Sequence, residues 1–251
     1  MAWPHYDDGM EESVARIVRR MEHSLGRLDA GDARRFFHET YLRTTLAVAA
    51  EIDRGGFADG PWLERWDVVF AELYLDAFDA RLAGAPVPGP WRVAFDTARD
   101  RPGLPPLRHV LLGMNAHINY DLPQSLVAVI SSAEFDDPAA LRRREADHRH
   151  VDAVLLNRVG AEDVQMRSVS TVRRRDRLLG PLNRAATKRV LREARAKVWR
   201  NAAVLDRARR DGTTEAVLGR LDQACTAKLM ELTAPGQVML RLARRGFGVT
   251  V

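Results

Sequence analysis

The chain has 251 residues, of which 46% are hydrophobic and 29% are charged, and Cys225 is its single cysteine. This composition excludes intrinsic disorder, and one cysteine excludes an internal disulfide and a cysteine-rich zinc module. The net charge of +5 is uneven, because residues 1–140 carry −8 and residues 141–251 carry +13. Long arginine-rich helices with a solvated face explain this asymmetry, and an anionic partner is the alternative explanation.

The N-terminal segment MAWPHYDDGMEES lacks the basic and apolar regions of a secretory signal. No apolar run approaches the roughly 18 to 20 residues that a membrane span requires. We therefore expect a soluble, cytoplasmic protein without a membrane span.

Apolar residues recur at spacings of three and four along almost the whole chain, and no run alternates like a strand. This pattern predicts an all-α fold. The expected helices cover about 9–29, 32–54, 61–83, 90–99, 105–120, 123–133, 138–159, 181–211, 213–233 and 235–245.

Glycine and proline mark the expected ends of these helices. Gly55 and Gly56 end one helix, Pro138 starts another after two aspartates, and Gly212 ends the long basic helix. Because no repeat or low-complexity linker interrupts the pattern, we expect one domain over residues 1–251, a bundle of about eight to ten helices. Residues 160–180 lack a clear apolar stripe and are interpreted as a loop or lid.

The most informative segment is 105–132, which is strongly apolar but contains Asn115, His117, Asn119 and Asp121. Burying such groups without partners costs roughly 1 to 3 kcal/mol each. We therefore expect these side chains to bond one another, to line a wet pocket or to hold a ligand. His117 and Asp121 are four residues apart, so a helix presents both on one face.

Pro123 follows this group closely. Proline has no N–H, and its ring clashes with the carbonyl four residues earlier, so we expect the central helix to break at about Leu122. The free carbonyls, the imidazole and the carboxylate then suit a cation or a polar substrate. The structural alternative is a buried His–Asp hydrogen bond that holds the kink against a neighbouring helix.

His148 and Asp152 form a second pair at the same spacing, on a stripe with Val151. Two such pairs on separate helices, with His117 and Asp121 as the first, are an economical ligand set for zinc or another divalent cation. His150 competes with His148 for the inward position. Nothing in the chain requires the two helices to be neighbours.

Two further residues interrupt apolar faces. Asp67 lies on the stripe of the helix at 61–83, where an unpaired charge is rare, and it could bridge to His117 or to Arg195. His38 also lies near an apolar face, and we interpret it as a structural residue with satisfied hydrogen bonds. The candidate catalytic residues are therefore His117, Asp121, Asn119 and Asp67.

The string GMNAHINYDLP, the pattern formed by Phe37, Tyr41, Leu42 and Thr45, and the block WDVVFAELYLDA together resemble a mainly bacterial family of helical proteins of unknown function. The resemblance extends to about residue 205, and its most specific part is the HINxDL motif. The family has asparagine where this chain has Asp152, so the second pair is a departure from its pattern. The resemblance implies no established activity.

A more distant similarity is to the zinc-dependent phospholipase C and single-strand nuclease group, which is all-α and uses histidines paired with carboxylates on helices. This similarity is an analogy only.

These observations favour an enzyme with a polar pocket between helices, which acts on a small-molecule substrate. With a metal, the His–Asp pair would support hydrolysis of an anionic or ester substrate. Without one, the pair would serve as acid and base in isomerisation or cyclisation of an apolar molecule. The other alternative is a non-catalytic helical binding protein. Specific nucleic-acid binding is not expected, because acidic residues dilute the basic half and no aromatic platform accompanies it.

Overall fold

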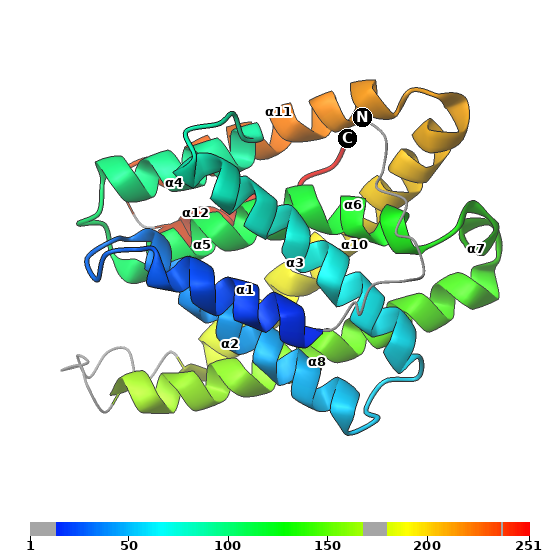
Figure 1. Cartoon of the computed structure of the whole chain (residues 1–251), viewed down its shortest axis with the longest axis horizontal. Coiled ribbons are helices and arrows are strands. Elements are labelled where there is room, and N and C mark those ends of the chain that lie inside the picture. Colours follow the sequence, from blue (N-terminus) through cyan, green and yellow to red (C-terminus); the bar gives the residue numbers. More distant parts are fainter. Residues whose placement is uncertain (1–13, 168–179, 237) are drawn as a thin grey trace.

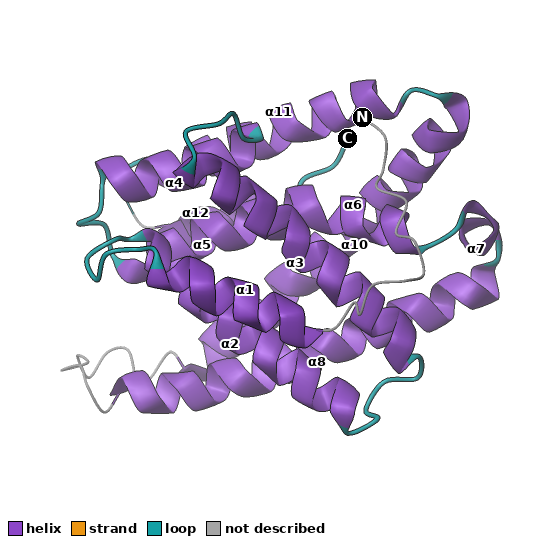
Figure 2. Cartoon of the chain, in the orientation of Figure 1, coloured by secondary structure: helices purple, strands orange, loops and turns teal. Residues whose placement is uncertain are grey.

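The computed structural model describes residues 14–167, 180–236 and 238–251. Within these ranges every regular element is helical, which confirms the predicted all-α class (Figure 2). The elements are α1 (Val14–Gly26), α2 (Arg34–Asp53), α3 (Gly60–Leu82), α4 (Gly89–Asp100), α5 (Pro106–Ala116), the π-helix η1 (His117–Asp121), α6 (Leu122–Val129), α7 (Ser132–Asp136), α8 (Pro138–Arg167), α10 (Gly180–Asp211), α11 (Thr214–Thr233) and α12 (Val238–Arg245).

Local sequence signals determine where these helices begin. The Asp59 side chain accepts a hydrogen bond of 3.0 Å from the Trp62 amide at the start of α3, where Pro61 occupies the first turn. Ser131 and Glu134 form a reciprocal capping box at the start of α7. These signals explain why most of the predicted helix positions agree closely with the structure.

The expected loop or lid at 160–180 is wrong in its first part, because residues 160–167 continue α8 as far as Arg167. One glycine, Gly160, costs a helix only about 1 kcal/mol, and the alanine and acidic residues after it are compatible with a helix. Residues 168–179 of the predicted lid lie outside the described residues.

The predicted break at Leu122 is also wrong, because α5, η1 and α6 form one continuous helical rod (Figure 1). The Leu122 amide bonds to the carbonyl of His117, five residues earlier, and both residues have right-handed helical dihedral angles. Pro123 then lies in the first turn of α6, where its missing N–H is tolerated. A wider π turn thus accommodates the proline without breaking the rod.

This rod runs through the middle of the bundle. α2, α4 and α11 contact α5, whereas α3 and α10 contact both η1 and α6. One apolar cluster surrounds α5 and the other surrounds α6, and Ile118 of η1 packs against both. The π turn therefore lies where the two halves of the core meet.

Many arginines of the basic half are paired with acids. Asp206 is 1% exposed and binds Arg209 and Arg210, and Arg210 also binds Asp136 at 2.7 Å. This pairing fits the interpretation of the basic residues as a solvated helix face. Among the described helices, none combines the length and the apolar character needed to cross a bilayer.

Candidate functional site

The site is organised by His117 and Asp121, which the π turn places side by side in the core. Nδ1 of His117 lies 2.8 Å from Oδ2 of Asp121, and the two side chains are 5% and 2% exposed. The indole Nε1 of Trp91, from α4, donates to the same carboxyl oxygen at 2.9 Å. The predicted His117–Asp121 contact is therefore present, with Trp91 as a third member.

Aromatic rings from three helices surround the imidazole of His117. The Phe70 ring of α3 is stacked on it, with a centroid separation of 3.6 Å and an interplanar angle of 6°. The Tyr41 ring of α2 approaches edge-on at 4.5 Å. Phe37, Tyr74 and Trp91 have centroids 6.0 to 6.1 Å away. The imidazole thus lies in an apolar, aromatic environment.

The second ring nitrogen of His117 has no matching contact. Nε2 is buried and has no hydrogen-bond partner among the described residues. His38 is different, because its Nε2 lies 2.8 Å from the Met21 carbonyl and its Nδ1 lies 2.8 Å from the Tyr74 hydroxyl. His38 is therefore a satisfied structural residue, as its sequence context predicts, and His117 is not.

Asp67 does not bridge to His117 or Arg195, as the sequence had led us to expect. It is 4% exposed, and its Oδ2 has no partner in the described part of the chain. It lies on α3 one turn before Phe70, on the stripe that faces the π turn. The nearby hydroxyls of Tyr41 and Thr45 are likewise buried without a well-formed hydrogen bond.

Burial dominates the electrostatics of the site. It lowers the pKa of His117 well below its ordinary value and raises that of Asp121 well above, since each charged form loses its hydration. Burial, with a smaller contribution from Glu64, raises the pKa of Asp67 to about 7. Burial also raises the pKa of Tyr41, more than the charges of Asp67 and Asp121 do. Both members of the His117–Asp121 pair are therefore uncharged: the imidazole is neutral and the carboxyl group is protonated.

Asn119 lies within the motif but points away from His117. Its amide nitrogen donates to the Phe247 carbonyl at 3.0 Å, and its carbonyl oxygen accepts from the Val249 amide at 3.1 Å. Asn115 donates to the same Phe247 carbonyl at 3.0 Å. Both polar atoms of the Asn119 side chain thus bind the C-terminal segment. This geometry gives no support to the catalytic role that was expected for Asn119.

The second predicted pair is not assembled. Asp152 forms an ion pair with Arg195, whose guanidinium also donates to the His148 carbonyl at 2.5 Å. His148 is the inward residue, 3% exposed, and its Nδ1 accepts from the indole of Trp199 at 3.1 Å. Spacing alone could not reveal that Arg195 lies on the adjacent helix and takes the carboxylate.

The two histidines do not converge. The Trp66 ring packs edge-on against His148 at 5.2 Å and stacks on Phe70 at 5.3 Å, and Phe70 in turn covers His117. Two aromatic side chains thus link the imidazoles. In the described ranges, no group of three or more histidine, cysteine or acidic side chains is arranged to hold a metal ion. The four-residue ligand set expected for zinc is therefore not brought together.

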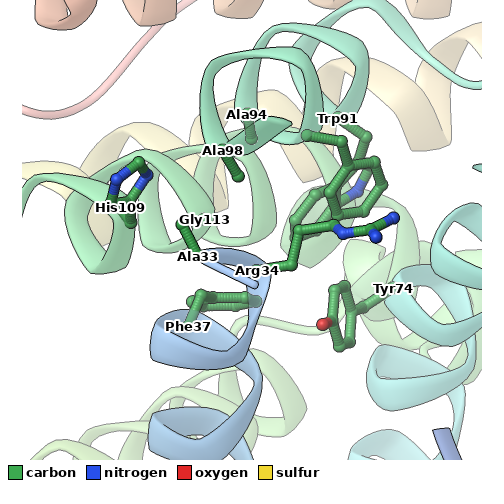
Figure 3. A pocket seen from close by; sticks show the side chains of 10 residues that line it. Ala33, Arg34, Phe37, Tyr74, Trp91, Ala94, Ala98, His109 and Gly113 are labelled. Carbon is green, nitrogen blue, oxygen red and sulfur yellow. The ribbon is translucent and has the colours of Figure 1, made fainter. Parts of the chain in front are cut away.

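A small cavity lies beside the site (Figure 3). Its volume of about 20 Å³ has room for about one water molecule, and its wall includes Phe37, Tyr74 and Trp91, which also contact His117. His109, at one end, is 4% exposed, and neither ring nitrogen makes a well-formed hydrogen bond. Gly113 faces Phe37, because a Cβ at this glycine would lie 2.2 Å from the Phe37 ring. The cavity is therefore separated from His117 by the aromatic rings that contact both.

Three partners of His117 were not identified from sequence. Trp91 lies in a short helix whose pattern shows only that it is amphipathic. Phe70 and Tyr41 occupy regular apolar positions, and such positions indicate burial but not which residue they contact.

Residues 14–235 match the family of unknown function DUF5995, and the chain belongs to this family. The comparison with curated proteins found no match. The comparison with solved structures also found none. The family assignment agrees with the sequence resemblance to a helical family of unknown function, although the match runs to residue 235 and not to about 205, and it brings no activity with it.

Proposed function

We propose that this member of the DUF5995 family is a proton-transfer enzyme, of the isomerase or cyclase kind, that acts on a small, uncharged and mainly apolar molecule. The His117–Asp121 pair is its acid–base centre. The observation that carries the proposal is the buried Nε2 of His117, which has no partner although Nδ1 is held by Asp121.

The comparison with His38 gives this observation its weight. A buried polar atom without a partner costs about 1 to 3 kcal/mol, so a purely structural histidine gains by satisfying both nitrogens. His38 does so in the same core. A free nitrogen on an oriented imidazole is instead the arrangement that a general acid or base requires.

The proton inventory supports transfer in both directions. In the uncharged pair, Oδ2 of Asp121 donates to Nδ1 of His117, and Nε2 keeps its hydrogen. When Nε2 gives that proton to a substrate atom, the proton of Oδ2 moves to Nδ1. The products are a neutral imidazole and an Asp121 carboxylate, which the Trp91 N–H stabilises. The reverse sequence takes a proton from the substrate.

Asp67 is the natural second group for an isomerisation. Its pKa of about 7 makes it half ionised near neutral pH, so it can accept a proton from one substrate atom while His117 donates to another. Tyr41 lies near both carboxyl groups: burial raises its pKa most, and negative charge on Asp67 or on Asp121 raises it further.

The side chains around His117 support a neutral, apolar substrate. Five aromatic rings surround the imidazole, and none of them could neutralise a charged substrate. They are Phe37, Tyr41, Phe70, Tyr74 and Trp91. A neutral, flat molecule therefore suits the site better than an anion. Access requires Phe37 to move, because its ring contacts both the small cavity and His117.

The metal-dependent alternative receives less support, because the carboxylate that would join His148 is held by Arg195. The lone Cys225 fits a reducing compartment, so the cytoplasm is our proposed location.

The test follows deuterium incorporation from D2O into 2-indanone, a neutral bicyclic ketone with acidic C–H bonds. We expect wild-type protein to accelerate exchange and His117→Gln to lower the protein-dependent rate by about 100-fold or more. His38→Gln is the matched control, because it removes a buried histidine of the same core and should retain the rate per folded molecule.

Phe37→Leu should lower the ketone concentration needed for half-maximal exchange, since a smaller side chain opens the path to His117. Equal exchange by wild type and His117→Gln would contradict the proposal. Binding of the ketone at His117 without exchange would favour the non-catalytic binding alternative.

A further inference from the structure

The C-terminal segment, residues 246–251, passes between α10 and the central rod, and residues 247–249 in it are buried. Phe247 and Val249 are 2% and 8% exposed. A Cβ at Gly248 would lie 2.9 Å from the Cα of Ala194, so the segment passes close to the backbone of α10. Figure 1 shows the short red coil that leads to the C-terminus.

Side chains of α10 bind the main chain of this segment. Glu193 accepts from the amides of Phe247 and Gly248 at 3.2 Å each. Asn201 donates to the Val249 carbonyl at 2.9 Å and accepts from the Val251 amide at 3.2 Å. Because these contacts use main-chain atoms, they hold the segment in one register against α10.

The central rod binds the opposite side of the same segment. Asn115 and Asn119 both donate to the Phe247 carbonyl, and Asn119 also accepts from Val249. These asparagines flank His117, two residues before and two residues after it. The rod therefore presents Asn115 and Asn119 to the C-terminal segment and His117 and Asp121 to the aromatic rings.

We infer that the C-terminal segment positions the acid–base pair, and that Asn119 is the positioning residue through which it acts. The inference rests on the proposed function, and it identifies what controls that site. π-helical turns are rare, because the α-helical hydrogen-bond register is usually the more stable one. A one-residue shift toward the α register would rotate the rod about its axis and turn His117 and Asp121 away from Phe70 and Trp91, and the two bonds of Asn119 oppose that rotation.

The test compares Asn119→Ala with Asn201→Ala. Each substitution removes two hydrogen bonds to the backbone of the same segment, but only Asn119 belongs to the π turn. The readout is the pair of imidazole ¹⁵N resonances of His117 in histidine-labelled protein, assigned with His117→Gln. His38 serves as an internal reference, because it makes no contact with the segment.

We expect both variants to unfold at lower temperature, and only Asn119→Ala to move the Nδ1 and Nε2 resonances of His117. Asn115→Ala, which removes one bond to the Phe247 carbonyl, should give a smaller shift in the same direction. This milder variant keeps the test decisive if Asn119→Ala does not fold.

Unchanged His117 resonances in Asn119→Ala, or in Asn115→Ala when the former does not fold, would overturn the inference. An equal shift in Asn201→Ala would do so too, because it would indicate general loosening. The ¹⁵N resonances of His117 can be measured whether or not the protein catalyses exchange. A shift in Asn119→Ala with inactive wild-type protein would therefore reject the proposed function alone, and normal exchange without a shift would reject the positioning role alone.

Discussion

The Phe70 ring lies almost parallel to the imidazole of His117, with ring centroids 3.6 Å apart. Phe70 belongs to the apolar cluster around α6, where it also stacks on Trp66 at 5.3 Å, whereas Tyr41 and Trp91, which also contact His117, belong to the cluster around α5. His117 therefore lies where the two clusters meet. Phe70 is 8% exposed, so the contact keeps water away from one face of His117. This shielding contributes to the burial that lowers the pKa of His117.

Phe70→Ala should lower the free energy of unfolding by about 3 to 5 kcal/mol, because it removes a buried ring and leaves a cavity. Urea denaturation followed by circular dichroism measures the change. Phe36→Ala is the control, since Phe36 is 36% exposed and should cost much less. Equal losses in the two variants would contradict the buried position of Phe70.

Asp67→Asn should stabilise the protein at pH 8 more than at pH 5. The folded-state pKa of Asp67 is about 7 and its ordinary value is 3.8, so the folded state binds the extra proton between these values. Stability is therefore lost as pH rises from 3.8 to about 7, by up to about 4 kcal/mol. Urea midpoints at the two pH values measure the difference, and a pH-independent effect would contradict it.

His148 should contribute in the opposite direction, by lowering stability as pH drops below 6.5. Burial, followed by the charge of Arg195, lowers its pKa well below 6.5, so the unfolded state takes up a proton that the folded state does not. The contribution is complete above pH 6.5 and is lost toward the lower folded-state pKa. His148→Gln should flatten this acid decline in unfolding experiments at pH 5 and 7.5.

The control for His148 is His150→Gln, because the His150 side chain is 41% exposed and binds Glu51 at the surface. If His150→Gln flattened the acid decline as much as His148→Gln, the assignment to the buried imidazole would be wrong.

Gly113→Ala should destabilise the protein by about 1 to 3 kcal/mol, because the added methyl group would overlap the Phe37 ring. Gly219→Ala should have the opposite effect and stabilise by about 0.5 to 1 kcal/mol. Gly219 is an exposed residue of α11 whose Cβ would meet nothing within 4 Å. Thermal unfolding of both variants measures the contrast, and stabilisation by both would show that Phe37 moves freely.

Periodicity and helix-start signals predicted the helices because these signals are local. The stripe of α3, with Asp59 and Pro61 before it, requires no knowledge of the other helices. The apolar run around His117 and Asp121 also predicted that both would be buried. Their contact followed from the spacing of four residues, which brings side chains together within a single turn.

The remaining features depended on which helices became neighbours. The sequence alone could not indicate that Trp91 binds Asp121, that Arg195 takes Asp152, or that Trp66 and Phe70 stand between the two histidines. These contacts depend on how different helices pack together, and a local sequence pattern does not indicate which helices become neighbours.

The fate of Pro123 shows the same division. Local chemistry determined that an ordinary α-helix could not continue there with all its hydrogen bonds. Whether the rod broke or widened into a π turn depended on its surroundings. In the folded bundle the widened rod buries Ile118 against both clusters, and Asn119 binds the C-terminal segment, so tertiary contacts from both sides compensate for the π turn.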